Sequence, residues 1–398
     1  MNLKRMVAIL LPVLVVLFLL SGCSSANYTD AQAKEQVDLG RKLIDSYLRS
    51  EVPQYEITGI YMEKGAEDPN RFGSVDSYLS HIVCAHFRTG DAIHILYAST
   101  ETGEIWTDLY LDIAEQRVRS LLEPFLKEYG LVNNCIQYKS GITFSVVSHD
   151  VPCKGETMDT CVAFGDVLPA SIRPGADDAL VDECLRQNGA GQVTVYFHDD
   201  RQGVFDPKLL WDFNERTGLN LLRASFYNVS LQDLQAVETT GTLTSSEKFT
   251  RSEQYSCSCA GAPGDNSPDP ASCSCIYYRF RRSEQNGIGI NYLDRYAKYS
   301  ILTGEIIEEE DFPCPVERLG NTLHYRKCRL YYPYVYFTVP PAFSSVSVTP
   351  VKNGQAGQPA ELYFIEYPNG FYSLGTQPDG VSAKGYEMMD DQILTFEP

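Results

Sequence analysis

The chain has 398 residues, 43% of them hydrophobic, which is enough for roughly two to four domains with their own cores and excludes a disordered stalk. Its formal net charge of −19 argues against partners that bind through phosphates, either nucleic acid or anionic lipid.

The chain opens with a pattern typical of an export signal. Lys4 and Arg5 precede an apolar run from Met6 to Leu20, which Pro12 interrupts. This run is shorter than the roughly 20 apolar residues that a membrane-spanning helix needs, so an ordinary transmembrane anchor is disfavoured.

The residues that follow this run read Leu-Ser-Gly-Cys and end at Cys23. The segment Leu20–Cys23 resembles the lipobox of bacterial lipoproteins. The resemblance implies that residues 1–22 are a signal peptide that is removed, that the thiol of Cys23 carries the lipid, and that residues 23–29 form a tether. A diacylated cysteine supplies the two acyl chains that stable anchoring requires. We therefore expect a lipid-anchored protein on the extracytoplasmic face of the cell membrane.

A module built from helices and an antiparallel sheet is expected over residues 30–150. Thr29 and Gln32 match a capping box at the start of an amphipathic helix. Residues 82–97 have the alternating pattern of a hairpin. A second helix follows, and we expect Pro124 to kink or shorten it.

Helix and strand patterns alternate over residues 151–240, which predicts a small α/β module of ferredoxin-like type. Asp206 and Pro207 form a favourable helix start, and this helix is expected to end at Gly218. Ser230 is expected to cap a further short helix.

Strand patterns dominate after residue 240. We expect a β-rich module over residues 241–312, with a cysteine-rich loop, and a β-rich C-terminal module over residues 313–398. The tyrosine-rich segment 332–336 is expected to form aromatic cross-strand pairs, with a ligand platform for sugars or peptides as the alternative. The expected fold class is a multi-domain α+β protein with a strand-rich C-terminal part.

A short repeat links the two halves of the chain. Thr-Gly-Glu-Ile occurs at residues 102–105 and again at residues 303–306, in each case after two predicted strands. A helix, two or three strands and this tetrapeptide resemble the PepSY-like modules of exported bacterial proteins. The resemblance covers residues 30–107 well and residues 230–308 loosely. It implies a binding role, often a proposed inhibition of secreted peptidases, and brings no catalytic residue with it.

The sequence contains 12 cysteines, which suits an exported protein because disulfides persist outside the cytoplasm. Two Cys-Ser-Cys triplets flank a loop rich in proline and glycine. If that loop closes an antiparallel hairpin, Cys257 faces Cys275 and Cys259 faces Cys273, close enough for disulfides. A four-thiolate zinc site is the alternative, although zinc ligands are usually separated by about two to four residues rather than one.

Sequence alone does not fix how the other cysteines pair. The candidate disulfides are Cys153–Cys161, Cys314–Cys328 and Cys84–Cys135. Cys184 is expected to remain unpaired and buried on the apolar stripe of a helix.

The hairpin over residues 82–97 offers one possible metal site. Cys84, His86 and His94 would suit zinc or copper if a three-residue turn brought them together, whereas a two-residue turn places Phe87 opposite His94. We favour an ordinary half-polar strand face. The acidic run 308–311 lacks the pattern of a calcium loop and is expected to be solvated. We therefore expect neither a metal nor a cofactor.

The sequence carries none of the common catalytic motifs, such as Gly-x-Ser-x-Gly or His-Glu-x-x-His. A pair of glycosidase carboxylates cannot be picked out among 52 acidic residues. We therefore predict a non-enzymatic lipoprotein that binds a protein or peptide at the cell envelope. The alternatives are the solute-binding lipoprotein of a transporter, which usually has two large alternating α/β lobes, and an exported hydrolase without a recognisable motif.

Overall fold

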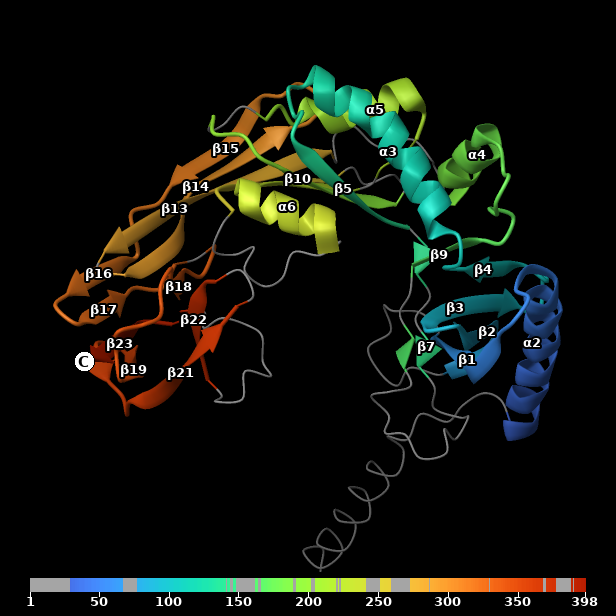
Figure 1. Ribbon diagram of the computed structural model, residues 1–398, viewed down its shortest axis with the longest axis horizontal. Helices are drawn as coiled ribbons and strands as arrows, with labels where there is room; N and C mark the ends of the chain where they lie inside the picture. The colour runs from blue at the N-terminus through green and yellow to red at the C-terminus, as the bar shows by residue number, and fades with distance from the viewer. Residues whose placement is uncertain are drawn as a thin grey trace, which may run out of the picture. The chain divides into compact units, whose positions relative to one another are not determined.

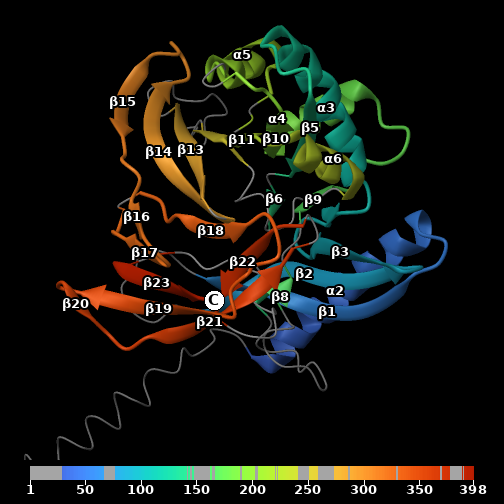
Figure 2. The same ribbon diagram turned by 60° about the vertical axis from the view of Figure 1, so that its left-hand side comes forward.

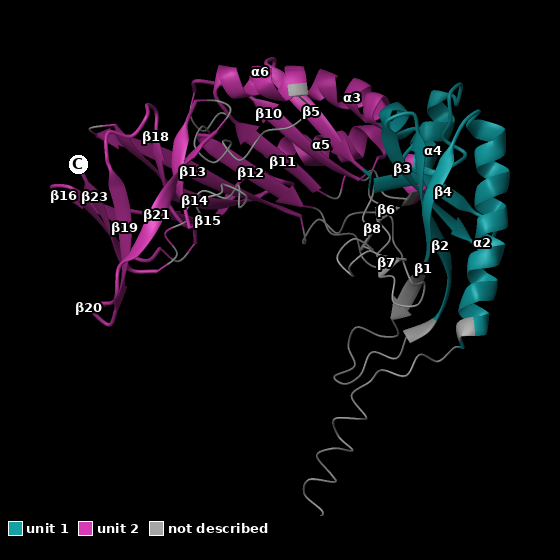
Figure 3. Cartoon of the chain, turned by 60° about the horizontal axis from the view of Figure 1, so that its bottom comes forward, with its two compact units in different colours: residues 1–114, 140–184 teal, residues 115–139, 185–398 magenta. Residues whose placement is uncertain are grey.

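The computed structural model describes the greater part of the chain from Thr29 to Pro398. The described residues are 29–66, 77–140, 142–143, 146–147, 162–163, 166–188, 191–201, 205–219, 221, 223–240, 251–258, 273–285, 287–328, 330–367, 370–376, 388 and 390–398. The chain divides into two compact units (Figure 3). Unit 1 holds residues 1–114 and 140–184, and unit 2 holds residues 115–139 and 185–398.

This division differs from the predicted modules. Residues 115–139 belong to unit 2, and strand β5 (Asn134–Lys139) within them pairs with β10 (Gln192–Phe197). Strand β9 (Asp166–Pro169) belongs to unit 1 and pairs with β4 (Ile105–Thr107). The predicted boundaries at residues 150 and 240 are therefore not those of the compact units, because strands far apart in sequence pair with each other.

Helix α2 (Asp30–Glu51) covers one face of the unit 1 sheet (Figure 1). Thr29 and Gln32 form the predicted capping box, in which each side chain accepts a hydrogen bond from the backbone of the other residue. Gly40 faces β2 (Ser77–Thr89), and a Cβ added there would lie 2.4 Å from the Cβ of Val83. The helix can approach the sheet this closely only because residue 40 has no side chain.

The sheet of unit 1 has the strand order β1-β2-β3-β4-β9-β6 among the described residues. Its remaining strands are β1 (Glu56–Ala66), β3 (Ala92–Ser99) and β6 (Ile142–Thr143), and a separate pair consists of β7 (Val146–Val147) and β8 (Val162–Ala163). Val83, Phe87 and Leu96 are buried on the face toward α2, and Cys84 and Tyr97 are buried on the opposite face. Both faces of this sheet are therefore shielded from solvent.

Helices and strands alternate in the first part of unit 2. The elements in this region are α3 (Leu111–Glu128), β5, α4 (Asp178–Asn188), β10, α5 (Lys208–Thr217), β11 (Arg223–Asn228) and α6 (Leu231–Thr240), of which α3 and α4 begin in unit 1. Strands β10 and β11 are parallel neighbours connected by α5, so they form a βαβ unit.

Local signals set the ends of several helices as predicted. Gly218 ends α5 in the left-handed region with a φ of 67°. Ser230 accepts a hydrogen bond from the N–H of Asp233 at the start of α6. Pro124 lies inside α3, which continues to Glu128, so of the two predicted effects this proline does not shorten the helix, and a kink stays a prediction.

The sheet continues from β11 through an antiparallel series of strands (Figure 2). These strands are β12 (Glu253–Ser258), β13 (Ser274–Gln285), β14 (Ile288–Ser300) and β15 (Ile306–Asp311). Phe226, Tyr255 and Tyr277 are buried in adjacent strands, and the ring centroids of the two tyrosines lie 4.7 Å apart. This row of aromatic rings forms the core that joins the strands.

The C-terminal part of unit 2 is strand-rich, as predicted. Its strands are β16 (Val316–Leu319), β17 (Thr322–Tyr325), β18 (Tyr334–Phe337), β19 (Ser345–Lys352), β20 (Gln355–Ala356), β21 (Ala360–Glu366), β22 (Tyr372–Gly375) and β23 (Gln392–Glu397). Tyr334 and Tyr336 are buried against Tyr367. These two tyrosines pack inside the fold and offer no exposed platform. The α+β class with antiparallel sheets is confirmed.

The two copies of Thr-Gly-Glu-Ile make the same turn. The N–H of Gly103 donates to the carbonyl of Ser99 at 2.9 Å, and the N–H of Gly304 donates to the carbonyl of Ser300 at 2.8 Å. The N–H of the glutamate that follows donates to the threonine hydroxyl, at 3.2 Å in the first copy and 3.3 Å in the second. The two glycines have φ angles of 76° and 72°. The repeat therefore encodes a specific backbone turn.

Each turn also closes the same succession of elements. Helix α2 is followed by β1, β2 and β3, then the turn and β4, and helix α6 is followed by β12, β13 and β14, then the turn and β15. Consecutive strands pair antiparallel in both series. The helices differ, because α2 packs on the strands of its own series whereas α6 contacts β5.

Replacing either turn glycine by alanine should lower the free energy of unfolding by about 1 kcal/mol, because a positive φ is unfavourable for a residue with a Cβ. The effect comes from the backbone conformation and not from a steric clash, since a Cβ at Gly103 would meet no atom within 4 Å. Urea denaturation of Gly103→Ala and Gly304→Ala measures the change. Asparagine tolerates this region better, so Gly103→Asn should cost less, and an equal cost for both substitutions would contradict this explanation.

Candidate functional site

The predicted disulfide between Cys257 and Cys275 is present. The two residues face each other in β12 and β13, both are buried, and their Cα atoms lie 3.9 Å apart. Two bonded sulfurs cannot act as thiolate ligands, which removes the four-thiolate zinc site. Cys273 is buried at the start of the same hairpin, and its predicted partner Cys259 lies outside the described residues. Cys23, Cys153 and Cys161 also lie outside them.

The predicted bond between Cys314 and Cys328 is not present. Both residues are thiols, and the Sγ of Cys314 donates to the carbonyl of Val316 at 3.4 Å. Cys84 lies in β2 of unit 1 and Cys135 in β5 of unit 2, where burial raises the pKa of the Cys135 thiol, and the bond between these two residues stays a prediction. Cys184 is buried in α4, as expected.

The hairpin over residues 82–97 has the register in which Cys84, His86 and His94 do not form a metal site. Thr89 pairs with Ala92 across a two-residue turn, so Phe87 faces His94 and their rings stack at 5.4 Å. His94 instead places Nδ1 3.3 Å from Oδ1 of Asp108, a carboxylate whose pKa is raised by burial. Among the described residues no group of three or more histidine, cysteine and acidic side chains is placed to hold a metal ion.

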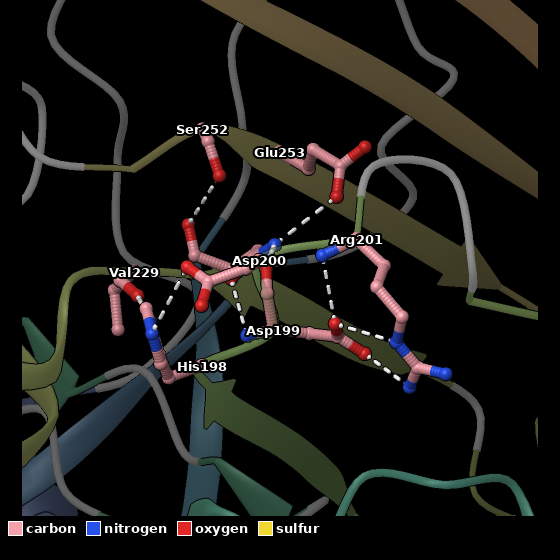
Figure 4. A network of polar contacts seen from close by, with 8 residues as sticks. His198, Asp199, Asp200, Arg201, Val229, Ser252 and Glu253 are labelled. Carbon is pink, nitrogen blue, oxygen red and sulfur yellow. Dashed lines mark hydrogen bonds and ion pairs between the residues drawn. The ribbon is translucent and has the colours of Figure 1, made fainter.

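Polar side chains gather instead where β10 and β11 end. We call them the carboxyl-edge cluster, and its members are His198, Asp199, Asp200, Arg201, Asn228 and Glu253 (Figure 4). The first four directly follow β10, Asn228 is the last residue of β11, and Glu253 begins β12, which runs the other way and so starts at the same edge. In open sheets with parallel strands, ligands bind at this edge.

His198 is oriented by the backbone of the next strand connection. Its Nδ1 lies 2.8 Å from the carbonyl oxygen of Val229, so Nδ1 carries the proton and donates. Its Nε2 lies 3.4 Å from Oδ1 of Asp200, whose side chain is 94% exposed. The ring is therefore held between the Val229 carbonyl and the Asp200 carboxylate.

Asp199 and Arg201 form a closed ion pair within the same loop. The guanidinium donates from Nε and Nη2 to the two carboxylate oxygens of Asp199 at 3.0 and 2.7 Å, and the N–H of Arg201 donates to Oδ1 at 2.8 Å. The Arg201 side chain holds the pKa of Asp199 below its ordinary value. Asp199 is therefore a charged partner that fixes the loop and is not suited to carry a proton near neutral pH.

Asn228 and Glu253 form the buried floor of the carboxyl-edge cluster. The side-chain amide of Asn228 accepts from the N–H of Asp199 at 3.0 Å and donates to its carbonyl at 2.7 Å. The same amide donates to Glu253 at 3.1 Å, and the hydroxyl of Tyr277 donates to Glu253 at 2.7 Å. Burial, together with the nearby Glu253, raises the pKa of Tyr277, so this hydroxyl stays protonated and remains a donor.

The geometry of this cluster supports a structural role, in which it holds chain segments in place, more than a catalytic role. The ring of His198 contacts only the Val229 carbonyl and the Asp200 carboxylate among the described residues, so no hydroxyl or thiol is placed as its nucleophile. The other carboxylates are engaged by Arg201, Asn228 and Tyr277. The cluster thus joins three chain segments.

Sequence reasoning missed this cluster, although one signal was available. The polar run 198–201 directly follows a predicted strand, which marks a strand end at which functional side chains commonly lie. The sequence did not show that Asn228 and Glu253 meet this run, because that requires knowing that β10, β11 and β12 are neighbours in the sheet.

Replacing Asn228 by alanine should lower the free energy of unfolding by about 2 kcal/mol, because it leaves buried polar groups of Asp199 and Glu253 without their partner. Urea denaturation measures the loss. The matched control is Asn321→Ala, which removes one hydrogen bond to a single carbonyl, that of Phe396. If Asn228→Ala lowers the free energy of unfolding no more than Asn321→Ala does, the Asn228 side chain does not hold these chain segments together.

Comparisons with protein-family models, curated proteins and solved structures find no match for this chain. Within the part of the chain that the structure describes, no helix is long and apolar enough to cross a membrane.

Proposed function

We propose that this chain is a lipid-anchored extracytoplasmic protein that binds a protein or peptide at the cell envelope and does not act as an enzyme. Its proposed location follows from the Leu20–Cys23 segment, which resembles a lipobox. The formal net charge of −19 agrees with attachment through a lipid, since an acidic surface is repelled by anionic headgroups.

The observation that carries the proposal is the repeated series of one helix and four antiparallel strands around an identical turn. The series α2 to β4 and the series α6 to β15 share strand order, pairing and the hydrogen bonds of the Thr-Gly-Glu-Ile turn. This arrangement supports the resemblance to PepSY-like modules, which are associated with binding and not with catalysis. Because the chain contains two such series, binding is the function that they support best.

The carboxyl-edge cluster supports the non-enzymatic part of the proposal. Its charged groups are mostly satisfied by one another, and His198 has no nucleophile beside it among the described residues. A hydrolase would need a nucleophile, or an activated water, next to an available base. For a solute-binding lipoprotein of a transporter, two alternating α/β lobes would be needed, whereas the described residues contain one parallel strand pair, β10 and β11.

The test exposes the lipidated mature protein to a library of extended peptides and analyses them by mass spectrometry. We expect a subset of peptides to be retained intact and none to be cut. His198→Ala should leave this retention unchanged, because the proposed binding function does not use His198. Cleavage that disappears in His198→Ala would instead establish an exported hydrolase.

A further inference from the structure

Unit 1 contains a depression of about 1060 Å³ at the end of α2, which we call the α2-end depression. It is lined by Glu51 at the end of α2, by Tyr110 just before α3, and after β9 by residues 170–171, residues 173–177 and Leu180. The side chain of Ile172, within this last segment, is buried. The volume lies just above the roughly 300–1,000 Å³ typical of small-ligand sites.

Opposite charges lie side by side in this depression. Nη1 of Arg173 is 3.5 Å from Oε1 of Glu51, and this is the only hydrogen bond or ion pair of the Arg173 side chain among the described residues. The side chain of Arg173 is 62% exposed and that of Glu51 is 21% exposed. The guanidinium therefore keeps several N–H groups for a ligand, and a contact this long and exposed is weak enough to be replaced.

A hydroxyl without a partner lies next to this pair. The Oη of Tyr47 is buried and makes no hydrogen bond within the described part of the chain. Its electrostatic neighbours are Tyr110, Glu51 and Arg173, which all line the depression. Burial raises the pKa of Tyr47 far above its ordinary value, so the hydroxyl keeps its proton. Tyr47 does not itself line the depression and lies behind the residues that do.

We propose that the α2-end depression binds the head group of a free α-amino acid. The carboxylate of the ligand pairs with Arg173, and its ammonium group pairs with Glu51. The head group fits because its two charged groups are attached to the same carbon atom, as the protein's own two charges are adjacent. A longer peptide, whose terminal charges lie far apart, cannot satisfy both residues at once. This site is independent of the peptide-binding function proposed above.

The test is isothermal titration of the mature protein with L-leucine, L-glutamate and L-lysine, which vary the side chain around a constant head group. The tightest of the three is then compared with its N-acetyl derivative, its amide and its tripeptide. We expect each of these derivatives to bind at least about tenfold more weakly, because each lacks one charge or separates the two. No binding by any of the three amino acids, or equal binding by the derivatives, would overturn the proposal.

Variants assign the binding to this place. Arg173→Gln and Glu51→Gln should each weaken the binding of the tightest amino acid about tenfold. The matched controls are Arg216→Gln and Glu128→Gln, which break an exposed ion pair of unit 2 with an N–O distance of 3.0 Å and should not change the affinity. An unchanged affinity in both Arg173→Gln and Glu51→Gln would mean that the amino acid binds elsewhere, and the site would be rejected.

Discussion

Replacing Cys257 and Cys275 together by alanine should lower the free energy of unfolding by about 3 kcal/mol. The disulfide joins residues 18 positions apart and restricts the loop between β12 and β13 in the unfolded chain. Both cysteines are buried, so the small, apolar alanine replaces them without adding an unpaired polar group. Urea denaturation under non-reducing conditions gives the change as a shift of the midpoint with little change of slope.

The matched control for this variant is the double replacement of Cys314 and Cys328 by alanine. These residues are thiols in the structure, so removing them should change the free energy of unfolding by no more than about 0.5 kcal/mol. The control also tests the correction of the predicted Cys314–Cys328 bond. A loss near 3 kcal/mol in the control and none in the Cys257/Cys275 variant would reverse the assignment of the bonds.

Features encoded within a few residues were predicted well. The capping box of Thr29 and Gln32, the end of α5 at Gly218 and the cap of α6 at Ser230 depend on side chains that reach neighbouring backbone groups. The Cys257–Cys275 bond belongs to this class, because alternation along two strands joined by one loop fixes which cysteines face each other.

Features that depend on distant pairing were not predictable. The placement of Cys135 follows from the pairing of β5 with β10, for which the sequence offers no local signal. The carboxyl-edge cluster and the Glu51–Arg173 pair also depend on distant pairing. Asn228 and Glu253 reach residues 198–201 only through the sheet order, and Glu51 meets Arg173 because β9 pairs with β4. In each case the participating residues are polar and unremarkable in sequence, and only the fold brings them together.

Replacing Cys23 by alanine should remove lipid labelling completely, because a lipobox without its cysteine has no thiol to modify. The same change alters the cut site, so an uncleaved variant would keep the apolar run Met6–Leu20, and its membrane fractionation would not report on the lipid. The acidic surface, with a formal net charge of −19, gives no attraction to anionic headgroups, so the lipid is the expected anchor of the mature protein. Metabolic labelling with palmitate measures the effect.

The control for this last experiment is Cys314→Ala, which removes an exposed thiol and should leave labelling unchanged. The mass of the mature, unsubstituted protein separates the two kinds of anchor. A cleaved and diacylated chain starts at Cys23, whereas a transmembrane anchor would keep the apolar run Met6–Leu20. A mature protein that keeps this run, or that carries no lipid on Cys23, would refute the lipoprotein proposal.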